Sequence, residues 1–524
     1  MGTWFIIIVS LCVAVLFKSL LNLIHPFSFS TKKLPPGPSI VPVIGNFIWL
    51  RKSFHEIELH LRKFRSKYGP IITVQIGSRP AIFIASHSLA HRALVQNGAV
   101  FSDRPKSIID SIFNSNQHNI TSSAYGPTWR LLRRNLTSEI LHPSRVRSYS
   151  QARRWVLGVL VGRLLQGHAS SFRVLDHFRH AMFCLLAIMC FGDGLDDEQI
   201  NQIETVHLQY ILSLPRFRIL NFWPRIGKIV FRRRWQEMIQ TEQGKEEEEE
   251  SVVAYVDTLV DLELPEEKRK LEDGEMVSLC REFINAGTDT TSTALQWIMA
   301  NLVKYPCIQA KLYEEITGVV GPPPHIRPGR DLAETEIIKE EDLQRMTYLK
   351  AVVLEGLRRH PPAHFLLPHA VTEDVEFEGY HVPKEATVNF MVADMGWDPK
   401  VWEEPMDFKP ERFLTNTGAG AGGGGNSEQK HCDGGGGEST SSLFDITGSR
   451  EIKMMPFGAG RRSCPGAGLA LLHLEFFVAN LVWHFEWTAE DGDEVDLTDK
   501  HEFTIVMKYP LRPTFPQGAS STES

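Results

Sequence analysis

The sequence has little cysteine, no long basic stripe and no nucleotide-binding loop. Its seven cysteines form no C-x-x-C pair and lack zinc-ligand spacing, which argues against a disulfide framework or a zinc site and favours a reducing compartment. The net charge of −7 argues against a nucleic-acid-binding protein. No dinucleotide-binding fingerprint is present either, which argues against a nucleotide-binding domain within this chain.

Enough apolar sequence is present for a large core, since 43% of the 524 residues are hydrophobic and 23% are charged, which is typical of a globular chain. The residue spacing predicts a helix over Phe54–Tyr68 and a hairpin of two strands, Ile71–Ile76 and Ala81–Ile84. Most of the chain that follows has helical spacing. Near the C-terminus, Phe503–Met507 alternates like a strand.

Within residues 1–25, the stretch 4–24 is apolar apart from a pause at Lys18, and it can span a membrane if this lysine extends to the interface. A cleaved signal peptide is the alternative, but the segment has neither a basic start nor a small-residue cleavage site. Lysines and arginines follow the segment and none precedes it. We therefore expect a membrane anchor with the following domain in the cytoplasm.

Proline defines the next segment, residues 26–45, through the run Leu34–Pro38. Such a run is extended and cannot be helical, so we expect a hinge that sets the angle of the main domain, 46–524, to the membrane. A ligand for adaptor domains is the alternative. Within the main domain, residues 417–440 are rich in glycine and are expected to be a flexible insert.

A glycine-rich loop presents Cys464 just before an apolar helical run, Leu469–Phe485. The N–H groups at a helix N-terminus stabilise a thiolate, so we expect a lowered thiol pKa and metal ligation. Arg462 can pair with an anionic group, and glycines let the backbone approach a flat cofactor. Haem meets these demands. An ordinary buried cysteine in a turn is the alternative.

The segment Ala286–Thr291 lies inside a helix predicted over Ser278–Lys304 and combines glycine, aspartate and threonines. These residues are poor helix formers, which suggests a function. A threonine hydroxyl can bond the carbonyl one turn back and open a groove for dioxygen and water. A packing glycine beside a satisfied polar cluster is the alternative.

The loop pattern Phe-x-x-Gly-x-Arg-x-Cys-x-Gly resembles that of the cytochrome P-450 superfamily of haem-thiolate monooxygenases. The resemblance runs along nearly the whole chain and implies a mainly α fold with a small β-rich subdomain, behind the N-terminal transmembrane anchor. It implies Cys464 as the axial ligand of the haem iron. In this loop it also implies cofactor contacts by four further residues, Pro456, Phe457, Arg462 and Gly466.

Other positions that match the family's motifs imply further roles. Trp129 and Arg133, one turn apart, correspond to residues that reach a haem propionate, although a solvated basic face is the alternative. His369 stands where relatives bind a propionate, the alternative being a surface histidine. In the family's distal helix, Ala286 and Gly287 line the cofactor, and the catalytic pair Asp289 and Thr290 delivers protons to oxygen.

Three charged residues match a structural network of the family. Glu355 and Arg358 are helical neighbours three residues apart, and Arg412 follows in a Pro-Glu-Arg-Phe segment. We expect these three side chains to form ion pairs that hold the fold rather than take part in chemistry.

The resemblance implies a monooxygenase that inserts one atom of O2 into a hydrophobic small molecule, with electrons from NADPH delivered by a separate NADPH-cytochrome reductase. It places the enzyme in the endoplasmic reticulum membrane. Leu367–His369 and Asp445–Pro456 look like a plant A-type enzyme, most similar to family 89. The alternatives are a haem-thiolate isomerase or dehydratase that needs no reductase, and a non-catalytic haem-binding protein.

Overall fold

The computed structural model describes residues 33–38, 52–76, 79–106, 118–166, 173–192, 195, 198–206, 253–324, 336–414 and 444–514, except 385 and 490–493, with six positions between 4 and 15. The chain divides into unit 1, which comprises Met1–Ser107 and Phe365–Met391, and unit 2, which comprises Ile108–His364 and Val392–Ser524. Almost all of the expected anchor, 1–25, and the whole of the insert, 417–440, lie outside the described residues.

Unit 1 contains the predicted helix and hairpin. Helix α3 (Phe54–Tyr68) begins with a capping box, in which Ser53 and Glu56 bond each other's backbone N–H groups. Strands β1 (Ile71–Ile76) and β2 (Arg79–Ile84) pair antiparallel, so the hairpin prediction is confirmed. The other elements of this unit are α4 (His87–His91), η1 (Arg92–Gln96), β5 (Val375–Phe377), β6 (Tyr380–Val382) and β7 (Thr387–Phe390).

A segment far along the sequence completes the sheet of unit 1. Strand β7 pairs parallel with β2, which gives the order β1-β2-β7. Side chains including Ile72 and Phe83 pack in a small core with Leu61 of α3. The described part of the proline-rich segment, Lys33–Pro38, is not helical, and its Pro36 carbonyl accepts a hydrogen bond of 2.8 Å from Thr73 N–H.

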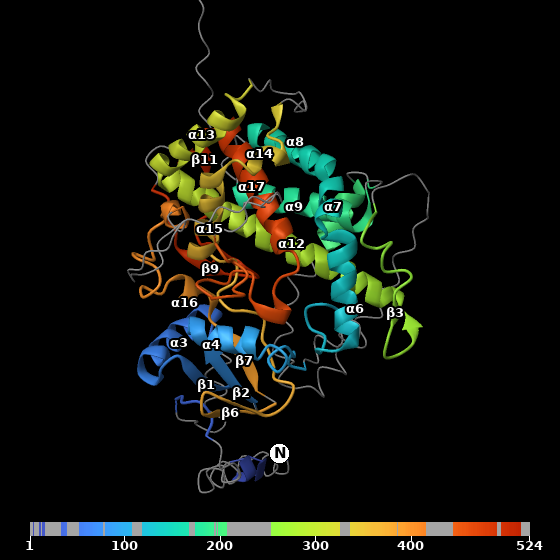
Figure 1. The fold of residues 1–524 in the computed structure, drawn as a ribbon, viewed down its shortest axis with the longest axis vertical. Helices are drawn as coiled ribbons and strands as arrows, with labels where there is room; N and C mark the ends of the chain where they lie inside the picture. Colours follow the sequence, from blue (N-terminus) through green and yellow to red (C-terminus); the bar gives the residue numbers. More distant parts are fainter. Residues whose placement is uncertain are drawn as a thin grey trace, which may run out of the picture. The chain divides into compact units, whose positions relative to one another are not determined.

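Unit 2 is mainly helical, and its described strands occur in short pairs, so the expectation of a mainly α fold with a small β-rich part is confirmed for the described residues (Figure 1). Its elements are α6 (Pro127–Asn135), η3 (Leu136–Ile140), α7 (Pro143–Ser148), α8 (Ser150–Gln166), α9 (Val174–Phe191), β3 (Glu263–Leu264), β4 (Arg269–Lys270), α12 (Asp273–Lys304), α13 (Pro306–Val320), α14 (Glu340–Leu343), α15 (Thr347–Arg359), α16 (Val392–Gly396), η7 (Pro410–Phe413), η8 (Gly460–Arg462), α17 (Ala467–His484), β8 (Thr488–Ala489), β9 (Asp499–His501), β10 (Ile505–Met507) and β11 (Pro513–Thr514).

Helix α12 runs through the helical part of unit 2 (Figure 1) and packs against α9, α15 and α17. Helices α9 and α17 are long and apolar enough to cross a membrane, but most of each is buried inside the protein. Their apolar surfaces belong to one continuous core with α8 and α12. Both are therefore core helices whose apolar surfaces are mostly covered by the rest of the protein.

Glu355 and Arg358 form an ion pair that is almost completely buried on α15. The Arg358 guanidinium donates to both carboxylate oxygens, at 2.7 and 2.8 Å, and also to the Gly396 and Pro405 carbonyls. Arg412 of η7 donates to the same carboxylate at 3.1 Å. This arrangement ties α15 to the chain that follows α16.

Replacing Glu355 with Gln should destabilise the protein strongly, because Arg358 would stay buried with its charge uncompensated. Removing one partner of a buried pair costs about 3–5 kcal/mol of unfolding free energy. Chemical denaturation followed by circular dichroism measures the effect. The matched control is Glu494→Gln, since Glu494 is 91% exposed in its pair with Lys304. Equal small decreases in unfolding free energy in both variants would refute a structural role for the network.

Candidate functional site

The loop before α17 holds Cys464 through its backbone. The Cys464 N–H donates to the Phe457 carbonyl at 2.8 Å. Between them, Gly458 and Gly460 have φ values of 69° and 70°, in the left-handed region that residues with a Cβ adopt only with strain. Glycine at these two positions therefore lets the loop fold back and place the thiol at the start of α17.

Cys464 is an exposed residue, yet the protein atoms around its thiol raise the thiol pKa. The Gly466 N–H and the charge of Arg133 lower the pKa, but the loss of hydration outweighs them. The expectation of a lowered pKa was wrong: the helix N-terminus acts as predicted, but burial acts more strongly in the opposite direction. A bound metal ion would supply the missing stabilisation.

Two arginines from distant segments lie against the ring of Trp129 on α6. The Arg462 guanidinium is 4.4 Å from the ring centroid and that of Arg133 is 5.6 Å away. Arg462 also donates to the carbonyls of Ile120 and Ser123, at 3.2 and 2.6 Å. The cysteine loop and α6 therefore meet through cation–π contacts that bring positive charge beside the thiol.

The indole N–H of Trp129 donates to the Ile120 carbonyl at 3.1 Å. The sequence-based expectation was that this side chain reaches a propionate; here its donor is bonded to the backbone and its ring supports the two arginines. The remaining loop residues of the prediction, Pro456 and Phe457, are half-buried beside the cysteine.

These residues fit a haem. Arg133 is half-buried and has no ion pair with any described carboxylate, so it can take an anionic group without losing a partner. The protein alone does not stabilise the Cys464 thiolate, so an iron ion is a suitable partner for this sulfur. The guanidinium groups of Arg133 and Arg462 are suitable partners for the two haem propionates. The groups available to such a cofactor are therefore the Cys464 sulfur, the Gly466 N–H and the Arg133 guanidinium.

Ala286 and Thr290 mark an accessible face within α12. Ala286 is exposed and Thr290 is half-buried, whereas Thr288 and Asp289 between them are buried. The Thr290 hydroxyl donates to the Ala286 carbonyl at 2.6 Å, which is the bond that the sequence suggested. The hydroxyl oxygen keeps its lone pairs available on the accessible face.

Gly287 allows a close approach, but to another helix. A Cβ on Gly287 would lie 2.6 Å from Leu186 Cδ1 of α9. The prediction placed this glycine against the cofactor, whereas its missing side chain makes room for helix packing. The alternative of a packing glycine is supported at this position, and the predicted contact with the cofactor stays a prediction.

Asp289 is buried and forms an ion pair with Arg179 of α9, at 3.0 Å between Oδ1 and Nε. Burial raises the pKa of the Asp289 carboxyl, Arg179 lowers it, and Glu502 raises it. Arg179 in turn lies 3.9 Å from Glu502. Sequence reasoning missed Arg179 and Glu502, because no local motif marks them and only folding brings them to α12.

His369 belongs to unit 1 and is 3% exposed. Its Nδ1 forms a hydrogen bond of 2.7 Å with the Phe101 carbonyl, and its ring packs edge-on against Phe390. The alternative of a plain surface histidine is therefore wrong. Its predicted contact with a propionate stays a prediction.

Comparisons with known proteins agree over nearly the whole chain. The family model described as Cytochrome P450 matches residues 35–512. Cytochrome P450 89A9 of Arabidopsis thaliana is 49% identical over 97% of each chain, and Cytochrome P450 71B8 of the same plant is 28% identical over 97% of this chain and 98% of its own. A solved zebra fish cytochrome P450 with abiraterone has a TM-score of 0.65 and 21% identity, over 88% of this chain and 100% of that chain.

Replacing Arg133 with Gln should weaken haem retention, because a charge-assisted bond to a propionate and a stabilising charge near the thiolate are both lost. A loss of about 1.5–3 kcal/mol corresponds to haem release at least tenfold faster. Transfer of haem to an excess of haem-free globin measures the rate. The control is Arg134→Gln, which removes an exposed charge from the next position; equal release from both variants would contradict the assignment.

Proposed function

The chain belongs to the cytochrome P450 family, and from this premise we propose that it inserts one oxygen atom of O2 into a hydrophobic small molecule. Proteins of this family are in general haem-thiolate monooxygenases, and haem iron is their cofactor. When bound, the haem supplies the redox chemistry that activates dioxygen. The observation that carries the proposal is Cys464, held by its loop beside the unpaired charge of Arg133.

We assign the binding of the cofactor to residues of unit 2. The Cys464 sulfur binds the iron as thiolate and increases its electron density. The Gly466 N–H donates a hydrogen bond to the sulfur. This bond adjusts how much electron density the thiolate donates to the iron. Arg133 and Arg462 pair with the propionates, and Trp129 holds both guanidinium groups in place.

Asp289 and Thr290 are assigned to proton delivery. Because burial raises the pKa of Asp289, its carboxyl binds a proton more readily than an exposed aspartate does. The Thr290 hydroxyl donates its hydrogen bond to the Ala286 carbonyl. Its oxygen can therefore accept a hydrogen bond from a water molecule. Water ordered there can carry a proton along the open face of α12.

Two electrons come from NADPH through a separate reductase. The sequence contains no dinucleotide fingerprint, so we assign NADPH binding to NADPH-cytochrome reductase as a partner. The apolar segment within residues 1–25 has its one lysine, Lys18, toward its C-terminal end, and further lysines and arginines follow it. This bias supports a single-pass anchor in the endoplasmic reticulum membrane and a catalytic domain in the cytoplasm. A membrane location brings the enzyme close to hydrophobic substrates.

The proposal is tested by incubating the membrane-bound protein and its reductase with a plant extract, with and without NADPH. New oxygenated metabolites should appear only with NADPH, and 18O2 should label them. Products that form equally without NADPH would favour an isomerase or dehydratase. No product, together with no NADPH consumption, would favour a haem-binding protein without catalysis.

Replacing Thr290 with Ala should uncouple the reaction, so that NADPH is consumed at a similar rate while the yield of product per NADPH falls about tenfold or more. The reason is loss of the Oγ1 that orders water beside Ala286. Product and hydrogen peroxide are measured together. Thr290→Ser keeps the hydroxyl and should restore coupling; the same coupling in the Ala variant as in the parent protein would refute the role.

A further inference from the structure

Three carboxylates, those of Glu275, Glu282 and Asp289, lie along one side of α12, because each follows the last by about two helical turns. Arg269 donates to both oxygens of Glu275, each at 2.8 Å. His118 Nδ1 also forms a hydrogen bond with this carboxylate, at 2.5 Å. The charge of Glu275 is therefore compensated by the side chains around it.

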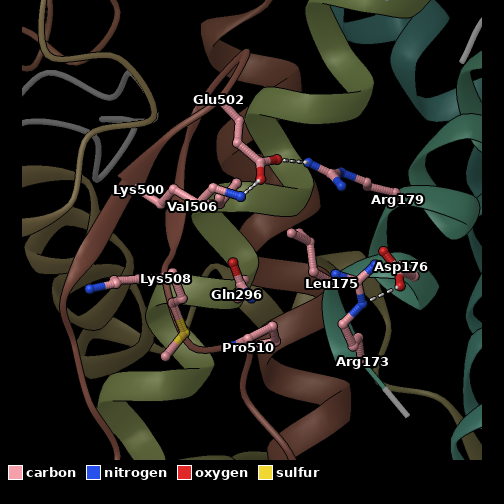
Figure 2. Close-up of a pocket in the computed structure, with 11 residues that line it drawn as sticks. Arg173, Leu175, Asp176, Arg179, Gln296, Lys500, Glu502, Val506, Lys508 and Pro510 are labelled. Atoms are coloured by element: carbon pink, nitrogen blue, oxygen red, sulfur yellow. Dashed lines mark hydrogen bonds and ion pairs between the residues drawn. The ribbon is translucent and has the colours of Figure 1, made fainter. Parts of the chain in front are cut away.

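The charge of Asp289 is compensated as well, by Arg179 of α9 at 3.0 Å. Figure 2 shows Arg179 directed toward a second carboxylate, that of Glu502, which lies 3.9 Å away. Glu282 differs from the other two carboxylates, because it forms no ion pair within the described residues. Its partners are backbone N–H groups.

Glu282 holds the segment His118–Ser123 by its backbone. The Glu282 Oε2 accepts a hydrogen bond from the Ile120 N–H at 2.8 Å, and Oε1 accepts one from the Thr121 N–H at 2.5 Å. Hydrogen bonds to a charged carboxylate are roughly twice as strong as those between neutral groups. Burial raises the pKa of the Glu282 carboxyl, and the bonds to Ile120 and Thr121 oppose that rise.

One peptide group joins Glu282 to the residues assigned to the haem propionates. The Ile120 carbonyl and the Thr121 N–H belong to the same planar peptide unit and point in opposite directions. On its carbonyl side, this unit accepts hydrogen bonds from the Trp129 indole at 3.1 Å and from the Arg462 guanidinium at 3.2 Å. A hydrogen bond at one end of a peptide group polarises it and strengthens the bonds at the other end.

The segment His118–Ser123 is also bonded within itself. The Asn119 side-chain oxygen accepts hydrogen bonds from the Ser122 N–H and hydroxyl, at 2.9 and 2.8 Å, and Asn119 is 2% exposed. The Ser123 carbonyl accepts a further bond from Arg462, at 2.6 Å. Because the turn is held together in this way, a shift of the segment would move both carbonyl acceptors of Arg462.

We propose that Glu282 is a positioning residue for the haem propionates, and that it acts through the Ile120–Thr121 peptide on Arg462 and Trp129. The inference rests on the proposed function, in which Arg462 and Arg133 pair with the propionates. Without the carboxylate, the N–H of this peptide loses its acceptor and the peptide plane can rotate. The carbonyl then no longer fixes the direction of the guanidinium.

The test is the rate at which the haem-loaded, full-length Glu282→Gln variant releases haem to an excess of haem-free globin. Glutamine has the same shape as glutamate, but its NH2 group accepts no hydrogen bond, so one of the two N–H groups loses its partner. Release should be about tenfold faster than from the parent protein, as expected for the loss of a hydrogen bond to a charged group. The absorption band of the reduced, carbon monoxide-bound variant should keep its position, because the Cys464 sulfur is not displaced.

The matched control is Glu315→Gln. Glu315 also accepts hydrogen bonds from two consecutive N–H groups, those of Tyr348 and Leu349 at 2.7 and 2.9 Å, but these residues belong to the start of α15. This variant should lose a similar amount of unfolding free energy and release haem at the rate of the parent protein. Equal release from the Glu282 and Glu315 variants would overturn the proposal, since Glu282 would then act only on the stability of the fold.

A double variant tests the route through Arg462. Arg462→Gln alone should release haem faster, and adding Glu282→Gln should change that rate by less than about threefold, because both changes break the same chain of hydrogen bonds. Two independent effects that multiply would overturn the proposal. Unchanged release from Arg462→Gln alone would refute the assignment of Arg462 to the propionates, and the role of Glu282 with it.

Glu282→Asp provides the same measurement if Glu282→Gln prevents folding. Aspartate keeps the carboxylate but is shorter by one CH2 group, so it reaches the two N–H groups less well. Its release rate should lie between those of the parent protein and the Gln variant, which is a partial rescue by the retained charge. Release from Glu282→Asp at the parent rate, in the absence of a folded Gln variant, would contradict the proposal.

Discussion

The proposed function depends on one sulfur atom, that of Cys464, which would have to carry a charge in a place where burial opposes it. The thiol of Cys464 has a raised pKa although a glycine N–H and an arginine favour the thiolate. A metal ion at the sulfur removes this conflict, because a coordinating thiol is deprotonated outright. The glycine-rich loop, the start of α17 and the arginine pair on Trp129 all hold the sulfur in this setting.

Helix α12 has two different faces near Thr290. Ala286 and Thr290 form an accessible face whose hydroxyl is fixed by a hydrogen bond, and Asp289 points to α9, where Arg179 pairs with it.

Periodicity and motif spacing predicted the elements but not the partners. The hairpin β1–β2, the helix around Ala286 and the cysteine loop could be identified because the signal is local. The raised pKa of Cys464, the packing of Gly287 against Leu186 and the pairing of Asp289 with Arg179 could not. Each of these features depends on which distant segment folds against the motif. The residues around a motif do not identify that segment.

The most direct test of the account is the absorption spectrum of the purified, reduced protein with carbon monoxide bound. A thiolate ligand gives the red-shifted band characteristic of haem-thiolate proteins, and the account predicts this band for the parent protein. A spectrum typical of histidine ligation, or a protein that contains no haem, would contradict the central claim that the Cys464 sulfur binds the iron.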